Sequence, residues 1–310
     1  MISISNSREF PVRRPLRTAI AVIGLSAAFA LTACGSSDDS SSSSKPTIVT
    51  STNVWGSVAS AIAGDNASVK SLISDPSADP HSYESTPSDA ATVTDADLVV
   101  FNGGGYDEFI EKILNGKKDK PTVDAYELLP PDPSVTGQRN EHVWYDITTV
   151  DAVAHKIADE LAKLDPPNAR TYGDRAATFE TQLYGIAQIS GKIAADHPNS
   201  PVAQTEPIAH YLLVSAGVED LTPKEFEEAI EEGNDPSANA VATTRDLLTS
   251  KKVRALVYNI QTEDKVTEDL RKVAESAGVQ IVEVTETLPE GLDYIQWQTR
   301  NAEALAKALN

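Results

Sequence analysis

The sequence contains little sulfur and few basic residues, and both shortages exclude classes of protein. Its 310 residues include one cysteine, so neither an intramolecular disulfide nor a cysteine-rich zinc site can form. The single methionine is the initiator, which excludes a methionine-rich copper site. Only 26 basic residues stand against 46 acidic ones, and the phosphates of a nucleic acid would repel the resulting net charge of −20. We therefore expect no nucleic-acid partner.

The rest of the composition is that of an ordinary folded protein. Hydrophobic residues make up 40% of the chain and charged residues 23%, a balance that excludes wholesale disorder and a polytopic membrane protein. At roughly 100–200 residues per domain, the length indicates about two domains.

Residues 1–33 have the features of a targeting signal. Three arginines between positions 13 and 17 precede the almost wholly apolar run Ala19–Leu31. This run has 13 residues, whereas a membrane-spanning helix needs about 20, so it fits the core of a signal peptide. The cysteine that follows it resembles that of a bacterial lipobox, which implies cleavage before Cys34 and attachment of lipid to this residue. The alternative is an ordinary signal peptide with an incidental cysteine.

A polar segment separates this signal from the folded body. Residues 34–45 read CGSSDDSSSSSK, a composition that cannot bury a core and predicts a flexible tether. We therefore expect a body outside the cytoplasm that is anchored to the cell membrane through the lipid on Cys34. This location disfavours a cytoplasmic enzyme.

The body alternates short β-rich runs with segments of helical spacing. Strands are predicted at Thr47–Thr50, Val69–Ile73, Leu98–Asn102, Val202–Thr205, Val253–Asn259 and Ile281–Thr285. The alternation predicts an α/β fold with mostly parallel central sheets flanked by helices. Such sheets usually bind ligands on the loops at the carboxyl ends of their strands.

The middle of the chain breaks this alternation. Apolar residues recur every three or four positions from Ala169 to Ala195, which predicts one helix about 40 Å long. We expect this helix to be a rigid link between two lobes. The predicted division is an N-terminal lobe at 46–165, a linking helix at 166–195 and a C-terminal lobe at 196–310.

Four motifs fall on predicted strand-to-helix loops, two in each lobe. DPHSYE contains His81, HVWYD contains His142, TEPIAHYL contains His210, and TETLPEGLDYIQW contains Asp293. In this order, with the long helix between the second and third, the motifs resemble the metal-binding substrate-binding proteins of bacterial ABC importers, the zinc/manganese family (cluster A-I). The acidic run Glu225–Glu232, by contrast, is interpreted as a solvated helix face.

The resemblance covers essentially the whole body and implies a function. It implies two α/β lobes that close on one divalent ion, in a protein that is not an enzyme. It also implies delivery of the ion to a membrane permease driven by a cytoplasmic ATPase, and we expect the binding protein to be a monomer. Carried over residue by residue, the ligands are His81, His142, Glu206 and Asp293, with His210 as the alternative to Glu206.

The donor chemistry leaves two metals open. Neutral imidazoles and carboxylates suit Mn²⁺, Zn²⁺ and Fe²⁺, and two carboxylates offset the charge of a buried ion. Two histidines with two carboxylates form a harder ligand set than three histidines with one carboxylate, which favours Mn²⁺. The zinc members of the family often carry a histidine-rich loop, whereas Asn115–Asn140 contains no histidine. Zn²⁺ nevertheless out-competes Mn²⁺ at most nitrogen and oxygen sites, so we retain both, with Mn²⁺ slightly ahead.

Two other functions remain open. A surface-anchored zinc-dependent hydrolase needs three protein ligands around an open water position, usually with a general base nearby. Four ligands in a closed, dry cleft favour transport instead. A metal-binding adhesin is the second alternative, and the sequence has no pattern for or against it.

Overall fold

A computed structural model describes residues 45–310 apart from residues 79, 116, 118 and 132–138. The predicted signal peptide, Cys34 and all but the last residue of the predicted tether lie outside the described residues. The described residues form one compact unit. None of the helices in the described part is both long enough and apolar enough to cross a bilayer.

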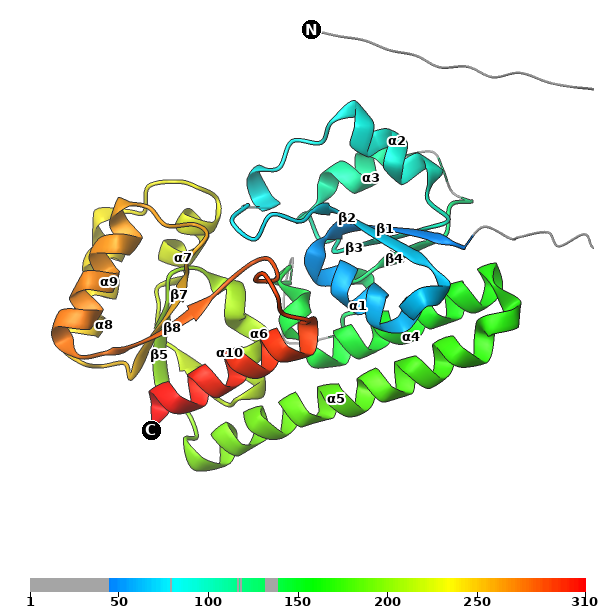
Figure 1. Cartoon of the computed structure of the whole chain (residues 1–310). Coiled ribbons are helices and arrows are strands. Elements are labelled where there is room, and N and C mark those ends of the chain that lie inside the picture. The colour runs from blue at the N-terminus through cyan, green and yellow to red at the C-terminus, as the bar shows by residue number, and fades with distance from the viewer. Residues whose placement is uncertain (1–44, 79, 116, 118, 132–138) are drawn as a thin grey trace, which may run out of the picture. The chain divides into compact units, whose positions relative to one another are not determined.

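Two four-stranded sheets form the framework, and every pairing between their described strands is parallel (Figure 1). The first sheet has the order β2 (Ser68–Ile73), β1 (Thr47–Thr52), β3 (Leu98–Phe101), β4 (Thr122–Asp124). The second has the order β6 (Glu219–Asp220), β5 (Pro201–Gln204), β7 (Ala255–Asn259), β8 (Gln280–Val284). If the strands of each sheet are numbered in chain order, both sheets have the order 2-1-3-4, so the two sheets share one topology.

Helices flank both sheets and confirm the predicted α/β fold. With the first sheet, α1 (Asn53–Ala63), α2 (Pro87–Asp95), α3 (Glu108–Leu114) and α4 (Ile147–Leu164) form what we call the first lobe. With the second sheet, α6 (His210–Ser215), α7 (Lys224–Glu231), α8 (Ala238–Thr249) and α9 (Lys265–Ala277) form the second lobe. The long helix α5 (Ala169–Asp196) lies between the lobes in sequence, and α10 (Tyr294–Leu309) ends the chain.

Helix α5 extends over 28 residues, close to the predicted Ala169–Ala195. Its buried residues recur at three- and four-residue spacing: Tyr172, Ala176, Phe179, Leu183, Ile186, Ser190 and Ile193. This stripe makes α5 amphipathic, and the helix contacts α1 and α4 of the first lobe, α6 of the second, and α10. A helix packed along its length against both lobes is suited to be a rigid link. The lobe boundaries at 46–165, 166–195 and 196–310 remain a prediction.

Helix α10 returns the chain from the second sheet to the first lobe. It runs beside α5 and also contacts β8 and α1 (Figure 1). At its first residue, the backbone N–H of Tyr294 donates to Ser57 Oγ (2.9 Å), and the Tyr294 hydroxyl donates to the carbonyl of Trp144 (2.6 Å). Both bonds fix the start of α10 to the first lobe.

The half-buried Asp220 and the buried Glu227 tie the short edge strand β6 to α7. Gln204 Nε2 donates to Asp220 Oδ2 (2.7 Å) and to Glu227 Oε1 (3.3 Å). Burial, followed by the charge of Asp220 and a hydrogen bond with it, raises the pKa of Glu227 to about 10. Glu227 is therefore protonated at neutral pH and shares its proton with Asp220.

We expect Glu227→Gln to be at least as stable as the wild type at neutral pH and to flatten the dependence of stability on pH. The folded pKa lies above the ordinary value of 4.5, so folding retains a proton that the unfolded chain releases. The stabilisation is complete below the ordinary pKa and is lost as the pH rises toward the folded pKa. Melting temperatures between about pH 5 and pH 9 should fall less steeply in the variant. Equal slopes for wild type, Glu227→Gln and the exposed control Glu228→Gln would contradict this account.

Candidate metal centre

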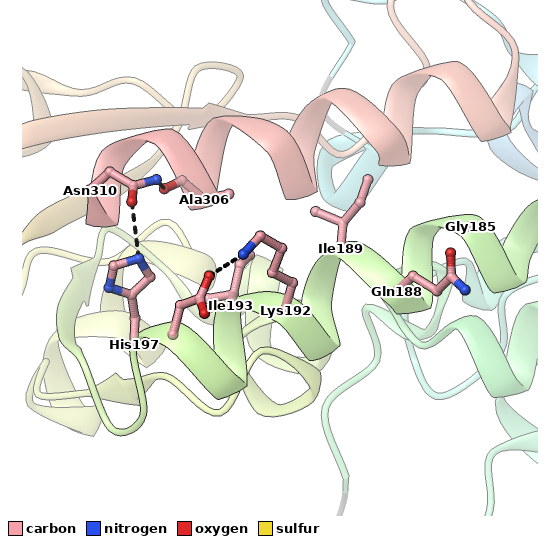
Figure 2. Close-up of a pocket in the computed structure, with 9 residues that line it drawn as sticks. Gly185, Gln188, Ile189, Lys192, Ile193, His197, Ala306 and Asn310 are labelled. Atoms are coloured by element: carbon pink, nitrogen blue, oxygen red, sulfur yellow. Dashed lines mark hydrogen bonds and ion pairs between the residues drawn. The ribbon is translucent and has the colours of Figure 1, made fainter.

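A groove lies between α5 and α10, and its lining is poorly suited to hold a metal ion (Figure 2). Its charged residues and its histidine already have partners within the groove. Lys192 pairs with Asp196 one helical turn away, and His197 Nε2 lies 3.3 Å from Asn310 Oδ1. The remaining lining is mostly apolar and includes Ile189, Ile193 and Ala306, with the amide of Gln188.

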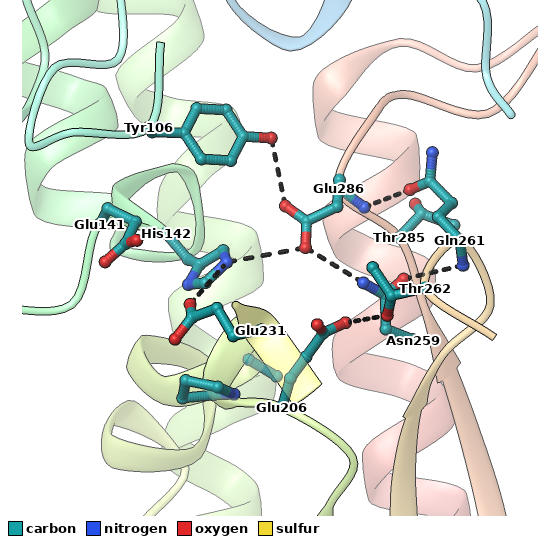
Figure 3. A network of polar contacts seen from close by, with 12 residues as sticks. Tyr106, Glu141, His142, Glu206, Glu231, Asn259, Gln261, Thr262, Thr285 and Glu286 are labelled. Carbon is teal, nitrogen blue, oxygen red and sulfur yellow. Dashed lines mark hydrogen bonds and ion pairs between the residues drawn. The ribbon is translucent and has the colours of Figure 1, made fainter. Parts of the chain in front are cut away.

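The residues that follow strands of both sheets meet elsewhere, as Figure 3 shows. Glu206 follows β5 by two residues, and Glu286 follows β8 by two residues. The Tyr106 hydroxyl, from the loop after β3, donates to Glu286 Oε2 (3.1 Å), and Asn259 Nδ2, at the end of β7, donates to Oε1 (3.0 Å). Glu286 is completely buried and is held by neutral donors from both lobes. Residues at the carboxyl ends of strands from both sheets therefore meet here, at the edge where folds of this class usually bind ligands.

His142 is completely buried in this region, and its surroundings fix its tautomer. Its backbone N–H donates to Asn140 Oδ1 (2.8 Å), which makes that oxygen an acceptor. The ring Nδ1 lies 3.0 Å from the same oxygen and therefore carries the proton, so Nε2 presents its lone pair. No hydrogen-bond partner for Nε2 is found among the described residues. Burial lowers the pKa of His142 to about 4, against the opposing charge of Glu141, so the ring is neutral at pH 7.

The lone pair of His142 faces carboxyl oxygens at a distance typical of ligands that share an ion. Nε2 is 3.6 Å from Glu286 Oε1 and 3.6 Å from Glu231 Oε1. A neutral imidazole forms no ion pair, and 3.6 Å is too long for a hydrogen bond. Two donor atoms about 2.1–2.2 Å from one ion, at angles of about 90–110°, lie roughly 3.0–3.6 Å apart. The geometry therefore suits a cation that binds Nε2 and one of these oxygens, and we call His142, Glu231 and Glu286 the buried group.

Glu206 is completely buried beside this group and begins the 3₁₀ turn Pro207–Ala209. Its Oε1 accepts a hydrogen bond from Thr262 Oγ1 (2.6 Å), so one carboxylate oxygen is oriented by the loop after β7. Asn140, which orients His142, also donates through Nδ2 to the carbonyl of Pro207 (2.9 Å). The segments that carry His142 and Glu206 are thus joined across the two lobes.

His81 lies on the solvent side of the group. It is exposed, on the 3₁₀ turn Pro80–Ser82, and its ring packs edge-on against Tyr106 with centroids 4.9 Å apart. Donor atoms of His81, His142 and Glu231 all lie within 4.8 Å of one another. The structure therefore brings together two of the predicted histidines, one from each of two first-lobe loops.

Asp293 and His210 do not join this group. Asp293 is exposed and caps α10. The backbone N–H of Gln296 donates to Asp293 Oδ1 (2.8 Å), and the backbone N–H of Asp293 donates to Gln296 Oε1 (3.2 Å). His210 is the exposed first residue of α6, and its ring packs edge-on against Tyr211. Glu286, seven residues before Asp293 in the same motif, lies in the group instead. Its position two residues after a strand, like that of Glu206, was the available signal.

Glu231 is the member that the sequence interpretation missed. It ends α7 within the run that was interpreted as a solvated face, yet its side chain is only 15% exposed. Burial, with the charges of Glu141, Glu206 and Glu286, raises the pKa of Glu231 to about 9. Glu231 follows Glu227 by one helical turn, but the sequence alone does not show that α7 buries Glu227.

A second set of donors with suitable spacing lies on the surface of α4 and α5. His155 Nε2 is 3.6 Å from both Asp151 Oδ1 and Glu180 Oε2. The three side chains are 47%, 32% and 59% exposed, respectively, so water competes for every ligand position. This surface set is a useful internal control for the buried group.

The side chain of Gln261 joins the loops of the two lobes beside the buried group. Its Oε1 accepts the backbone N–H groups of Glu286 and Thr287. Its Nε2 donates to the carbonyl oxygens of Pro76 (2.8 Å) and Ala78 (3.0 Å), on the loop after β2. One amide thus holds the Glu286 loop against the segment that leads to His81.

Comparison with known proteins gives an independent view of the chain. A family model described as "Zinc-uptake complex component A periplasmic" matches residues 48–308. The manganese-binding lipoprotein MntA of Halalkalibacterium halodurans is 33% identical over 54% of this chain and 56% of its own length. The iron-binding protein YfeA of Yersinia pestis is 28% identical over 53% and 54%, so these two matches span about half of each relative. The manganese ABC transporter substrate-binding lipoprotein PsaA of Streptococcus pneumoniae is 24% identical over 91% and 95%.

Solved structures share the fold. The periplasmic zinc-binding protein TroA from Treponema pallidum superimposes with a TM-score of 0.73 at 21% identity, over 86% of this chain and 99% of its own. The substrate-binding protein FpvC from Pseudomonas aeruginosa, in complex with Mn²⁺, gives 0.70 at 25% identity, over 86% and 98%.

We expect Gln261→Ala to loosen the Glu286 loop without unfolding the protein. The backbone N–H groups of Glu286 and Thr287 lose their acceptor. If each hydrogen bond contributes about 1 kcal/mol, their hydrogen exchange accelerates about fivefold or more. Native-state exchange measures this directly, with Gln280→Ala, an exposed substitution on β8, as the matched control. Unchanged protection of both amides in Gln261→Ala would contradict the assignment.

Proposed function

Because this chain belongs to the family of zinc-uptake complex component A periplasmic proteins, we propose that it captures a divalent transition-metal ion and delivers it to an ABC importer. The importer consists of a membrane permease driven by a cytoplasmic ATPase, and the cargo is one Mn²⁺ or Zn²⁺ ion. The observation that carries the proposal is the buried, neutral Nε2 of His142, whose lone pair faces Glu286 Oε1 at 3.6 Å.

The proposed ligands are His81 and His142 from the first lobe and Glu206 and Glu286 from the second. Glu286 takes the role that the sequence assigned to Asp293, and Glu206 is preferred to His210. Two neutral imidazoles and two carboxylates balance the charge of a divalent ion, which lowers the cost of burying it.

The burial of these groups supports transport rather than hydrolysis. His142, Glu206 and Glu286 are completely buried, and only His81 is exposed. A catalytic zinc centre keeps an open position for water and substrate, whereas a cargo site encloses its ion. The adhesin alternative has no supporting contact in the described residues.

The division of the ligands between two lobes supports a mechanism of capture and release. The ion binds tightly only when both lobes present their donors together, so binding energy favours the closed arrangement. Separation of the lobes removes two ligands at once, which would release the ion to the permease. Such a change couples metal affinity to lobe closure through the loops that Asn140 and Gln261 join.

We also propose that the protein works as a monomer outside the cytoplasm, anchored to the cell membrane by lipid on Cys34. The signal-like residues 1–33 and the serine-rich tether support this location. An anchored binding protein remains close to its permease, which raises its effective concentration there.

Titration of the metal-free protein with Mn²⁺ or Zn²⁺ should give saturable binding of one ion per chain. His142→Ala should weaken binding more than about 100-fold, because even residues that only orient metal ligands contribute 10–100-fold. Isothermal titration calorimetry and metal analysis measure both quantities. His155→Ala, in the surface set, is the matched control and should leave the affinity unchanged. Equal affinities in wild type and His142→Ala would reject the proposal.

The variants Glu286→Ala and Asp293→Ala should separate metal binding from folding stability. Glu286→Ala removes a proposed ligand, so metal affinity should fall more than about 100-fold. Asp293→Ala removes the cap of α10, so the free energy of unfolding should fall by about 1 kcal/mol with metal affinity unchanged. Calorimetric titration and thermal unfolding of both variants make the comparison. A loss of affinity in Asp293→Ala but not in Glu286→Ala would restore the sequence-based assignment.

A further inference from the structure

We propose that Glu231 is a fifth protein ligand of the cargo and selects an ion that takes more than four ligands, Mn²⁺ or Fe²⁺, over Zn²⁺. This inference rests on the proposed function, because it assumes that the buried group holds the transported ion. Its basis is the position of Glu231 Oε1, which lies as close to His142 Nε2 as Glu286 Oε1 does, at 3.6 Å. Donor atoms of Glu231, His142 and His81 lie within 4.8 Å of one another.

No hydrogen-bond donor among the described residues accounts for the position of Glu231 Oε1. Its Oε1 is buried and has no hydrogen-bond partner among the described residues. The charges that act on it most strongly are all acidic: Glu141, Glu206, Glu286 and Glu228. A buried carboxyl among other carboxyls is costly, and a cation among them relieves that cost.

The neighbouring imidazole is an independent observation that points to the same ion. His142 is completely buried, and its Nε2 has no hydrogen-bond partner in the described part of the chain. Its lone pair faces Glu231 as well as Glu286. An ion bound to His142 Nε2 and Glu231 Oε1 would satisfy the imidazole and this carboxyl group, with a donor of His81 within 4.8 Å of both.

Packing holds Glu231 in this position. Helix α7 buries Phe226 and Ile230 in the core of the second lobe, and Glu227 anchors it to Gln204 at the end of β5. The helix also contacts the 3₁₀ turn Pro207–Ala209, directly after Glu206. The same part of the second lobe therefore positions the carboxyl groups of Glu206 and Glu231.

A fifth ligand changes which metal the site prefers. Zn²⁺ sites with only protein ligands are almost always four-coordinate, and His81, His142, Glu206 and Glu286 already supply four. Mn²⁺ and Fe²⁺ accept higher coordination numbers, and Mn²⁺ favours sites rich in carboxylate oxygen. Glu231 therefore increases the affinity for Mn²⁺ and Fe²⁺ more than the affinity for Zn²⁺.

The test compares Glu231→Gln with wild type and with Glu228→Gln, an exposed residue of the same helix that pairs with Lys224. Affinities for Mn²⁺ and Zn²⁺ are measured separately, by competition with a chelator of known affinity. We expect Glu231→Gln to weaken Mn²⁺ binding at least about tenfold and Zn²⁺ binding less than about threefold. Glu228→Gln should change neither affinity.

Each other outcome has a defined meaning. Unchanged Mn²⁺ affinity in a folded Glu231→Gln protein overturns the role of Glu231 as a ligand, and equal losses for both metals overturn its role in selection. If Glu231→Gln does not fold, Glu231→Asp, which keeps the carboxylate but shortens its reach, should show the same selective loss of Mn²⁺. Absence of any one-to-one binding by the wild type overturns the proposed function itself, separately from the inference.

Discussion

The structure depends on one electrostatic constraint: acidic side chains from the second lobe are buried against a neutral imidazole from the first. Glu206 and Glu286 are completely buried, and His142 directs a lone pair toward Glu286 at 3.6 Å. Such an arrangement is expensive in a protein interior unless a cation occupies the space between the donors. The surrounding fold holds these groups together despite their mutual repulsion.

Neutral hydrogen-bond donors do much of that holding. Thr262 orients Glu206, while Tyr106 and Asn259 bind the two oxygens of Glu286. Since these donors carry no charge, they orient the carboxylates and leave their negative charge available to an ion. The parallel sheets place the donors at the carboxyl ends of strands from both lobes, and α5 and α10 pack the lobes into one unit.

The sequence predicted the framework better than the site. Long apolar runs and helical spacing identified six strands and α5, but the edge strands Thr122–Asp124 and Glu219–Asp220 are too short to give a periodic signal. In the last motif, the family resemblance assigned Asp293 as a metal ligand. The structure shows instead that Asp293 caps α10, and that Glu286 of the same motif lies in the buried group. Glu231 was missed because an acidic helical run resembles a solvated face until the packing of α7 is known.

Diffraction from crystals of the Mn²⁺-loaded protein, at wavelengths on either side of the manganese absorption edge, tests the central claim most directly. The account predicts one anomalous peak about 2.0–2.3 Å from Nε2 of His142 and from carboxylate oxygens of Glu206 and Glu286. A peak only at the exposed set of Asp151, His155 and Glu180, with none beside His142, would contradict it.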